Sequence, residues 1–175
     1  SRLGSCAVVI ESITENLQAK RGVIRKVEEV VSPATIIGSN TSSIPITDLQ
    51  RGARRPERIL GIHWGEPAHV SRFMEVICGR ETRLAHARRV VALARRWGKE
   101  PSLVRRDIRG FITNRIMYAM IREALYLVDA GYATVADVDR SVRNDMGYWT
   151  TLCGLFRYLD LTGIPAYETV MRGLF

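Results

Sequence analysis

Residues 58–77 read RILGIHWGEPAHVSRFMEVI, and this stretch decides the fold. Two short runs within it, Arg58–His63 and Phe73–Ile77, are mostly apolar, which is typical of strands in a buried sheet. The link between them is polar and holds a proline that turns the chain. If the two strands are neighbours, His63 at the end of the first strand comes close to Glu75 in the second.

The residues on either side continue an alternation of strands and helices. A short apolar run predicts a strand, and apolar residues at helical intervals predict a helix. By these signals we expect further strands at Cys6–Ile10, Thr35–Gly38 and Ser102–Val104, and helices at Glu15–Val31, Pro45–Leu49 and Thr82–Trp97. This alternation indicates an α/β fold with a parallel sheet.

The pattern changes after Gly110, where the chain becomes helical throughout. The expected helices are Phe111–Ala130, a helix capped by Thr134 that runs to Val142, Leu155–Leu161 and Ala166–Leu174. We therefore predict an α/β domain followed by an all-α domain. Residues 1–107 form the first and residues 108–175 the second.

The composition excludes several classes of protein. Of the 175 residues, 46% are apolar, which is enough to bury a core. No apolar run reaches the ~18 residues of a membrane span, and no signal-peptide pattern opens the chain. The three cysteines are widely spaced and form no CxxC pair, which argues against a disulfide scaffold or a zinc module. We expect a cytoplasmic protein with no membrane partner and no bound metal.

The formal net charge of +8 comes from the middle third of the chain. Residues 51–110 hold fifteen Lys and Arg against six Asp and Glu, whereas the flanking thirds are nearly balanced. Much of the excess lies on one side of the predicted helix Thr82–Trp97, with apolar residues on the other side. This is the pattern of an amphipathic surface helix. No nucleic-acid-binding motif accompanies the charge, and we expect no nucleic-acid partner.

None of the fourteen glycines belongs to a GxGxxG loop or a P-loop. If a nucleotide binds, its pyrophosphate cradle lies outside this sequence. The chain also begins only a few residues before a buried strand, as a fragment would.

His63 and Glu75 are the first candidates for chemistry. His63 ends a strand, where an α/β sheet presents side chains to a ligand crevice. Glu75 has apolar neighbours, and burying a carboxylate there is costly unless it is paired. A histidine held by a carboxylate suits a general base that works near neutral pH. A buried structural ion pair explains the same pattern, and the residues alone do not decide between the two.

Two polar sites are further candidates. The cluster Ser39–Ser43 follows a strand, and its side chains can bond a substrate oxygen or cap the next helix. Asn114 opens the long helix, where it can bind a ligand or satisfy the helix start. Both alternatives remain open for each site.

Five separated segments occur together in a characteristic order: VIE with ENL at 9–17, SNTSSI at 39–44, GIHW at 61–64, MEVI at 74–77 and GFITNR at 110–115. Together they resemble the 3-hydroxyacyl-CoA dehydrogenase family, including the 3-hydroxybutyryl-CoA enzymes. The resemblance runs from Val8 to about Gly163. It implies the second half of a Rossmann-type NAD-binding domain, followed by a helical domain that mediates homodimerisation.

The resemblance also implies roles for individual residues. His63 matches the catalytic base and Glu75 its carboxylate partner. The remaining matches are Ser42 at the reacting oxygen and close to the nicotinamide, Asn114 near the substrate carbonyl, and Glu15 and Lys20 at positions that touch the cofactor. The implied reaction is NAD-dependent oxidation of a 3-hydroxyacyl-CoA, or of a related secondary alcohol, as the small-molecule substrate.

The sequence departs from the family pattern after the histidine. The usual His-Phe-Phe-Asn-Pro is replaced by residues 63–67, HWGEP, so that Glu66 stands where an amide is expected beside the cofactor. A His-Trp variant resembles a branch of the family that acts on pyridine-ring compounds without CoA. The substrate can therefore be a CoA thioester or a non-CoA hydroxy compound. The chain can also be a catalytically silent dimerising fragment, and we expect it to be inactive by itself.

Overall fold

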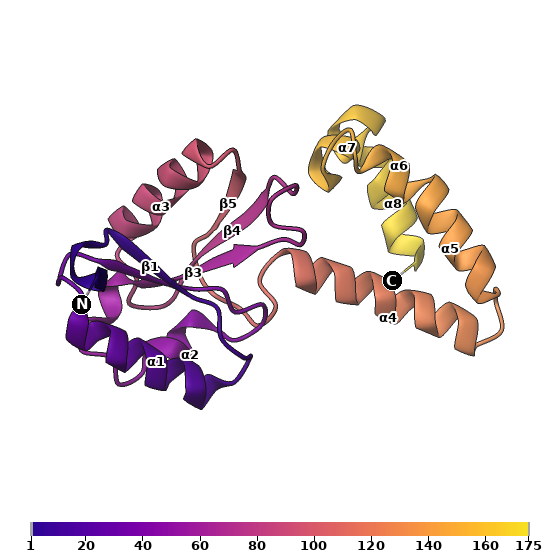
Figure 1. The fold of residues 1–175 in the computed structure, drawn as a ribbon. Coiled ribbons are helices and arrows are strands. Elements are labelled where there is room, and N and C mark those ends of the chain that lie inside the picture. Colours follow the sequence, from indigo (N-terminus) through magenta and orange to yellow (C-terminus); the bar gives the residue numbers. More distant parts are fainter. Residues whose placement is uncertain (1, 175) are drawn as a thin grey trace. The chain divides into compact units, whose positions relative to one another are not determined.

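Strands and helices alternate through the first hundred residues, as the sequence predicts. The structure is a computed structural model that describes residues 2–174 (Figure 1). In chain order the elements of this part are β1 (Val8–Glu11), α1 (Leu17–Val30), β2 (Ile36–Ser39), α2 (Ile46–Gln50), β3 (Ile59–Trp64), β4 (Phe73–Cys78), α3 (Leu84–Arg96) and β5 (Glu100–Val104). Short 3-10 turns lie at Arg2–Ser5 and Pro56–Arg58. The predicted boundaries agree with these within a few residues.

The five strands form one sheet in the order β1-β2-β3-β4-β5. Strands β1, β2 and β3 are parallel, and β4 is parallel to β5. The predicted parallel sheet was wrong at one place, because β3 and β4 are antiparallel. The link at residues 65–72 is too short for a parallel connection, which needs a crossover of a dozen or more residues.

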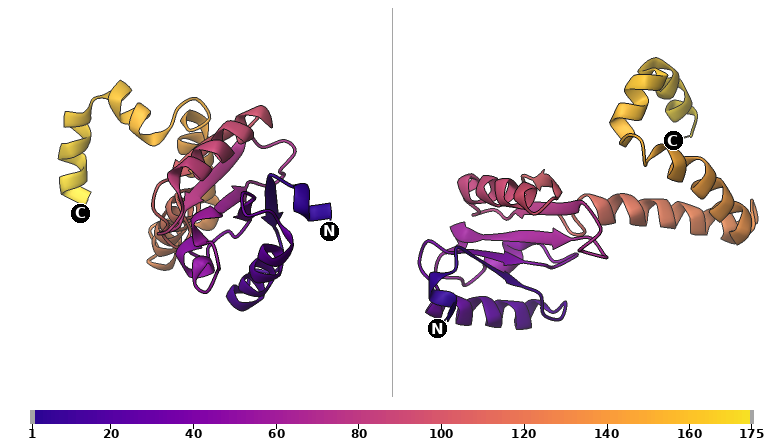
Figure 2. Two further views of the ribbon diagram at one scale, coloured as in Figure 1. Left: turned by 90° about the vertical axis from the view of Figure 1, so that its left-hand side faces the viewer. Right: turned by 45° about the horizontal axis from the view of Figure 1, so that its top comes forward.

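Helices cover both faces of this sheet (Figure 2). Helices α1 and α2 place Ile24, Ile46 and Leu49 against one face, in a cluster that includes Ile59 of β3. Helix α3 places Ala87, Val90 and Ala94 against the other face, and these residues are all buried. The arginines of α3 lie on its exposed side, as expected of an amphipathic surface helix. The architecture is therefore three-layered, with the sheet in the middle.

The rest of the chain is helical, as predicted: α4 (Thr113–Asp129), α5 (Val135–Asn144), α6 (Met146–Trp149), α7 (Leu155–Thr162) and α8 (Ile164–Leu174). The sequence reasoning missed only the short α6. Thr134 caps α5 as expected, because its side chain accepts a hydrogen bond from the backbone N–H of Asp137. No helix among residues 2–174 is both long and apolar enough to cross a bilayer.

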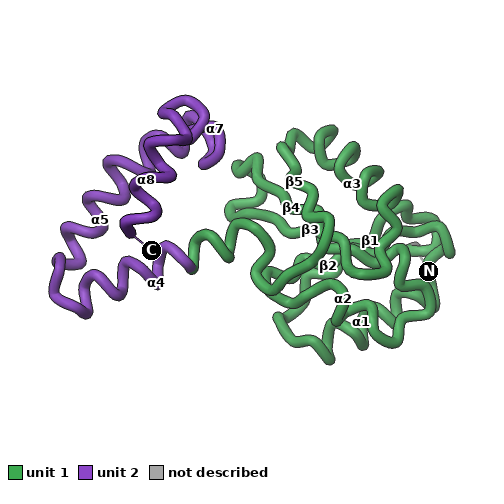
Figure 3. Tube along the Cα trace, turned by 180° about the vertical axis from the view of Figure 1, so that it is seen from behind, with its two compact units in different colours: residues 1–118 green, residues 119–175 purple. Residues whose placement is uncertain are grey.

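The chain divides into two compact units between Tyr118 and Ala119 (Figure 3). The second unit contains the end of α4 and helices α5–α8. None of its described residues, 119–174, is buried, and large apolar side chains such as Leu152 (72% exposed) and Phe156 (82% exposed) face outward.

Gly61 in β3 provides a test of the packing in the sheet. A Cβ atom at this position would lie 2.9 Å from the Cβ of Ile77 and 3.0 Å from the Cδ1 of Ile46, both of which are buried. We expect Gly61→Ala to lower the free energy of unfolding by roughly 1–3 kcal/mol, measured by urea denaturation.

Gly22→Ala in α1 is the matched control. A Cβ atom there meets no other atom within 4 Å, so the substitution is expected to stabilise the helix by up to about 1 kcal/mol. Equal stabilities of Gly61→Ala and the unchanged protein would contradict the close packing of β3 and β4.

Candidate active site

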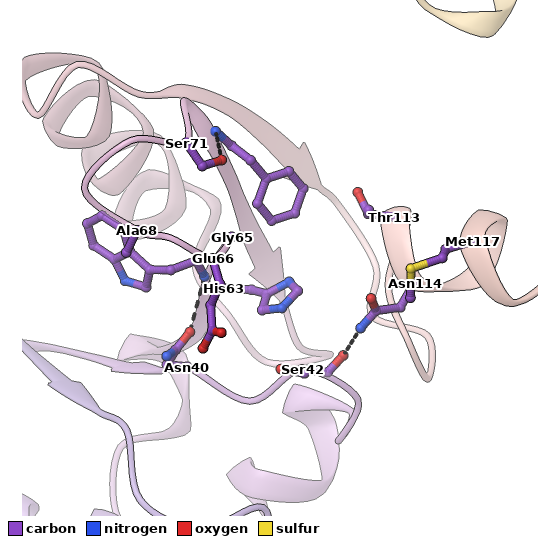
Figure 4. A pocket seen from close by; sticks show the side chains of 12 residues that line it. Asn40, Ser42, His63, Gly65, Glu66, Ala68, Ser71, Thr113, Asn114 and Met117 are labelled. Atoms are coloured by element: carbon purple, nitrogen blue, oxygen red, sulfur yellow. Dashed lines mark hydrogen bonds between the residues drawn. The ribbon is translucent and has the colours of Figure 1, made fainter. Parts of the chain in front are cut away.

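The polar ends of β2 and β3 open on one cavity of about 900 Å³ (Figure 4). Its wall includes Asn40, Ser42, His63, Glu66 and Asn114, all within the first compact unit. The carboxyl ends of parallel strands are where open α/β sheets bind their ligands. The cavity is thus in the place where the fold predicts a site.

His63 and Glu75 meet beside this cavity. They are direct partners in the antiparallel register of β3 and β4, and Nδ1 of His63 lies 3.0 Å from Oε2 of Glu75. The carboxylate accepts a hydrogen bond from the N–H at Nδ1, which leaves Nε2 as the basic ring nitrogen of a side chain that lines the cavity. The hydrogen bond to Glu75 therefore sets the tautomer and the orientation of the His63 imidazole.

Glu75 itself is 1% exposed, and its second oxygen is also satisfied. Oε1 accepts hydrogen bonds of 3.0 Å from the backbone N–H groups of Ile112 and Thr113. Burial raises the pKa of Glu75, but the hydrogen bonds from His63, Thr113 and Ile112 outweigh it and hold the pKa below its ordinary value. The carboxylate is therefore charged next to the imidazole at neutral pH.

The two backbone donors are aimed at Glu75 by a turn that the sequence did not reveal. Phe111 has a φ of 50°, in the left-handed region that non-glycine residues rarely adopt, and Gly110 before it also has a positive φ. The ring of Phe111 is buried and packs against His63, with the ring centroids 5.7 Å apart. Phe111 thus both turns the chain into α4 and forms a wall around the imidazole.

The polar cluster after β2 wraps around Glu15 and does not cap α2. Oε1 of Glu15 accepts hydrogen bonds from Oγ1 of Thr41 at 2.6 Å and from the backbone N–H groups of Ser42 and Ser43, both at 3.0 Å. Partial burial raises the pKa of Glu15. These hydrogen bonds and the charge of Lys20 lower it by more, so the pKa lies below its ordinary value. Helix α2 has no side-chain cap. Glu15 therefore sets the shape of the loop that carries Ser42.

Lys20 lies beneath this loop and is 1% exposed. Its ammonium is 2.8 Å from Oε1 of buried Glu11 and 3.5 Å from Oε2 of Glu15. Neither Lys20 nor Glu15 is part of the cavity wall. The structure thus places these two predicted cofactor-contacting residues in a network of charges that supports the crevice.

Asn114 and Ser42 come together at the cavity, seventy-two positions apart in the chain. Nδ2 of Asn114 donates to the backbone carbonyl of Ser42 at 2.9 Å (Figure 4), which leaves the amide oxygen and the Ser42 hydroxyl available to a ligand. Glu66 also lines the cavity, and its carboxylate has no hydrogen-bond or ion-pair partner within residues 2–174. One cavity therefore holds four of the predicted residues: His63, Ser42, Glu66 and Asn114. Glu75 contacts His63 and is not part of the cavity wall.

Sequence reasoning did not single out several other wall residues, namely Asn40, Trp64, Ser71, Phe73, Thr113 and Met117. Asn40 is held by the backbone, because its Oδ1 accepts a hydrogen bond from the N–H of Trp64 at 3.1 Å. Its position in the cluster Ser39–Ser43 was the one available signal. The other wall residues are apolar residues or single hydroxyl residues, and only the fold brings them to the cavity.

Comparisons with known proteins find similar sequences and structures. Residues 1–108 match the sequence profile of the 3-hydroxyacyl-CoA dehydrogenase NAD binding domain, and residues 110–175 match that of the C-terminal domain of the same family. The chain is 37% identical over 163 residues to 5-formyl-3-hydroxy-2-methylpyridine 4-carboxylate 5-dehydrogenase of Mesorhizobium japonicum, covering 93% of this chain and 53% of that protein.

Two further comparisons give the same result. A probable 3-hydroxybutyryl-CoA dehydrogenase of Bacillus subtilis is 38% identical over 167 residues, covering 95% of this chain and 57% of that protein. A crystal structure of a 5-formyl-3-hydroxy-2-methylpyridine 4-carboxylic acid 5-dehydrogenase, described as an NAD⁺-dependent dismutase, superposes with a TM-score of 0.94 at 36% identity, over 98% of this chain and 56% of that one. The chain thus spans about half the length of these relatives.

The lowered pKa of Glu75 predicts how stability depends on pH. The unfolded carboxyl titrates near pH ~4.3, so the ionised form stabilises the folded protein above that pH, and this stabilisation is lost as the pH falls through the lower folded pKa. We expect Glu75→Gln to lower the free energy of unfolding by roughly 1–3 kcal/mol at neutral pH. The difference from the unchanged protein should shrink as urea denaturation is repeated from about pH 7 down to about pH 3.

Glu29→Gln is the control for this experiment, since Glu29 forms only an exposed ion pair with Arg54 at 3.7 Å. Its effect should stay within about 0.5 kcal/mol over the same range. A Glu75→Gln difference that does not change with pH would show that the charge of Glu75 is not what stabilises the site.

Proposed function

The chain belongs to the 3-hydroxyacyl-CoA dehydrogenase family, and on that premise we propose that it carries the acid–base half of an NAD-dependent dehydrogenase that oxidises a secondary alcohol. The substrate is a 3-hydroxyacyl-CoA or a related hydroxy compound without CoA. The single observation that supports this function most strongly is the His63–Glu75 pair at a cavity on the carboxyl edge of the sheet.

The residues present fit the reacting end of the cofactor. The cavity opens where β2 and β3 end, and its wall offers the Asn40 amide, the Ser42 hydroxyl and the Glu66 carboxylate. A pyrophosphate cradle is not encoded in the 175 residues, which contain no GxGxxG loop. NAD would therefore be held jointly, with Ser42 and Glu66 of this chain near its reactive ring and its phosphates bound by other residues.

His63 takes the proton of the substrate hydroxyl in this mechanism. Because Nδ1 is hydrogen-bonded to Glu75, the lone pair on Nε2 accepts the proton, and the charged Glu75 stabilises the imidazolium that forms. When bound, NAD⁺ supplies the acceptor for the hydride that leaves the carbinol carbon. Phe73 and Phe111 pack around the imidazole at centroid distances of 5.5 and 5.7 Å and restrict its rotation and its contact with water.

Ser42 and Asn114 orient the oxygen that changes from alcohol to ketone. Their mutual hydrogen bond fixes the Asn114 side chain, and the network of Glu15 and Lys20 fixes the loop of Ser42. Donors held in place before the reaction stabilise developing charge on oxygen without reorganisation.

We propose the following domain roles and partners. Residues 1–107 complete the NAD-binding domain, and residues 108–175 form the helical domain. The helical domain forms a homodimer, which is supported by its exposed apolar side chains, such as Leu125 in α4, Leu152 in the turn before α7 and Phe156 in α7. A second candidate function, a catalytically silent dimerising module, is favoured by the same apolar surface and by the missing phosphate loop.

Replacing the histidine tests the dehydrogenase function. In a full-length protein that contains this chain and a phosphate-binding half, His63→Gln should lower kcat by roughly 10²–10⁴-fold, while NAD⁺ binding measured by calorimetry is retained. His86→Gln on the exposed arginine-rich helix is the control and should leave kcat unchanged. Near-normal turnover of His63→Gln on both 3-hydroxybutyryl-CoA and non-CoA hydroxy acids would remove the His63–Glu75 pair from the mechanism.

The chain by itself should be nearly inactive. Without a cradle for the pyrophosphate, the 175 residues lose the charge-assisted hydrogen bonds that such a loop provides, and we expect NAD⁺ binding and NADH formation close to background. Spectrophotometric measurement of NADH checks this expectation. Robust turnover by the chain alone would show that the described crevice is sufficient, whereas tight NAD⁺ binding would argue against the silent-module function.

A further inference from the structure

We propose that Lys99 is a positioning residue for the cavity: its ammonium fixes the β3–β4 loop, residues 65–72, and the fixed loop sets the affinity for the substrate. The proposal rests on the function proposed above. It assigns a role to a lysine that lies outside the cavity wall and outside every motif considered so far.

The β3–β4 loop supplies one side of the cavity. Gly65, Glu66, Ala68 and Ser71 belong to it and line the wall, and Figure 4 shows Glu66 close to His63. Residues 66–70 are all exposed, so no apolar packing of their own holds the loop in place. Within the loop, a turn is closed by hydrogen bonds from the N–H groups of Val70 and Ser71 to the carbonyl of Pro67.

Lys99 connects this loop to the body of the domain. Its Nζ donates hydrogen bonds to the backbone carbonyls of Ala68 and Ser71. Across residues 2–174, these are the only hydrogen bonds that join residues 65–71 to an element other than the adjoining strand β4. Apart from Arg72 at its end, whose carbonyl accepts a hydrogen bond from the N–H of Glu100 in β5, the loop therefore depends on one side chain for its connection to the rest of the domain.

The environment of the Lys99 ammonium is unusual for a surface loop. Lys99 is 8% exposed, and its Nζ lies 5.3 Å from the ring centroid of Trp64, a wall residue that stacks on Trp97 at 5.6 Å. No carboxylate in the described part of the chain pairs with it. Two carbonyls and an aromatic face are the partners that a buried lysine ammonium can use without a counter-ion.

A purely structural role for Lys99 predicts a different behaviour. If Lys99 only stabilised the sheet, its loss would affect the whole domain and would lower kcat and substrate affinity together. Because its partners are carbonyls of an exposed loop, its loss should instead release that loop. The imidazole is held separately by Glu75, so the proton transfer should survive while substrate binding weakens.

The test compares Lys99→Met with the unchanged full-length protein. Methionine keeps the apolar stem and removes the donors. We expect KM for the hydroxy substrate to rise about tenfold with kcat within about twofold, since two charge-assisted hydrogen bonds to the binding loop are lost. Hydrogen exchange should accelerate at the amides of residues 65–72 and stay unchanged in β1, β2 and β5.

Two further variants complete the experiment. Lys99→Gln retains an NH₂ group that can donate to both carbonyls, and it should restore KM and slow exchange in part. Arg72→Gln breaks only the exposed ion pair between Arg72 and Glu100 at the end of the same loop, and it should leave both readouts unchanged.

Each outcome decides the proposal. Unchanged loop exchange and unchanged KM in Lys99→Met overturn it, and so does a fall in kcat with KM retained. If Lys99→Met does not fold, Lys99→Gln decides. Compared with the unchanged protein, faster hydrogen exchange confined to residues 65–72 supports the loop role, and faster exchange throughout the domain overturns it. If the loop exchange responds as expected but no hydroxy substrate is turned over, the loop role stands and the proposed function fails.

Discussion

The carboxylate of Glu75 is the buried charge around which the site is organised. A carboxylate in an apolar strand is costly unless every lone pair finds a donor, and here three donors converge on it: the imidazole of His63 and two backbone N–H groups. The donors come from two segments: the imidazole belongs to β3, and the two N–H groups belong to the turn into α4. To satisfy one carboxylate, β3 must pair with β4 in one register, and the chain must return as α4 with its first turn against the end of the sheet. The orientation of the His63 imidazole and the position of the first turn of α4 are therefore consequences of the same charge.

A second buried charge network organises the neighbouring strands. Lys20 reaches from α1 to Glu11 at the end of β1, and Ser39 at the end of β2 donates to the other oxygen of Glu11 at 2.6 Å. Glu15 extends the network to the backbone of residues 42–43. The first network holds His63 and the second holds the loop of Ser42, so the Ser42 hydroxyl and the Glu66 carboxylate are not needed for these contacts. That separation allows Ser42 and Glu66 to keep polar groups available.

These networks also explain which features were predictable from the sequence. The strand elements followed from apolar runs, and the meeting of His63 with Glu75 followed from two strands joined by a short link. The direction of β4 was predicted wrongly because periodicity carries no information on strand direction, although the length of the link does. The left-handed conformation of Phe111 had no signal, since non-glycine residues rarely adopt it. Nothing in the sequence indicated a role for Lys99 either, because that role depends on two carbonyls that only the folded loop presents.

Under the proposed function, this chain supplies the groups for proton transfer and other residues bind the phosphates. This division has an energetic meaning, because in a nucleotide-dependent enzyme the tight binding of the phosphates holds the reactive ring against the acid–base group. The hydrogen bond to Glu75 orients the His63 imidazole within this chain alone. In the proposed function, a chain with this network therefore preserves the geometry of the His63–Glu75 pair on its own, and activity would require a second element that brings the hydride acceptor to the cavity. An ordered site with little activity of its own is the state that this distribution of residues predicts.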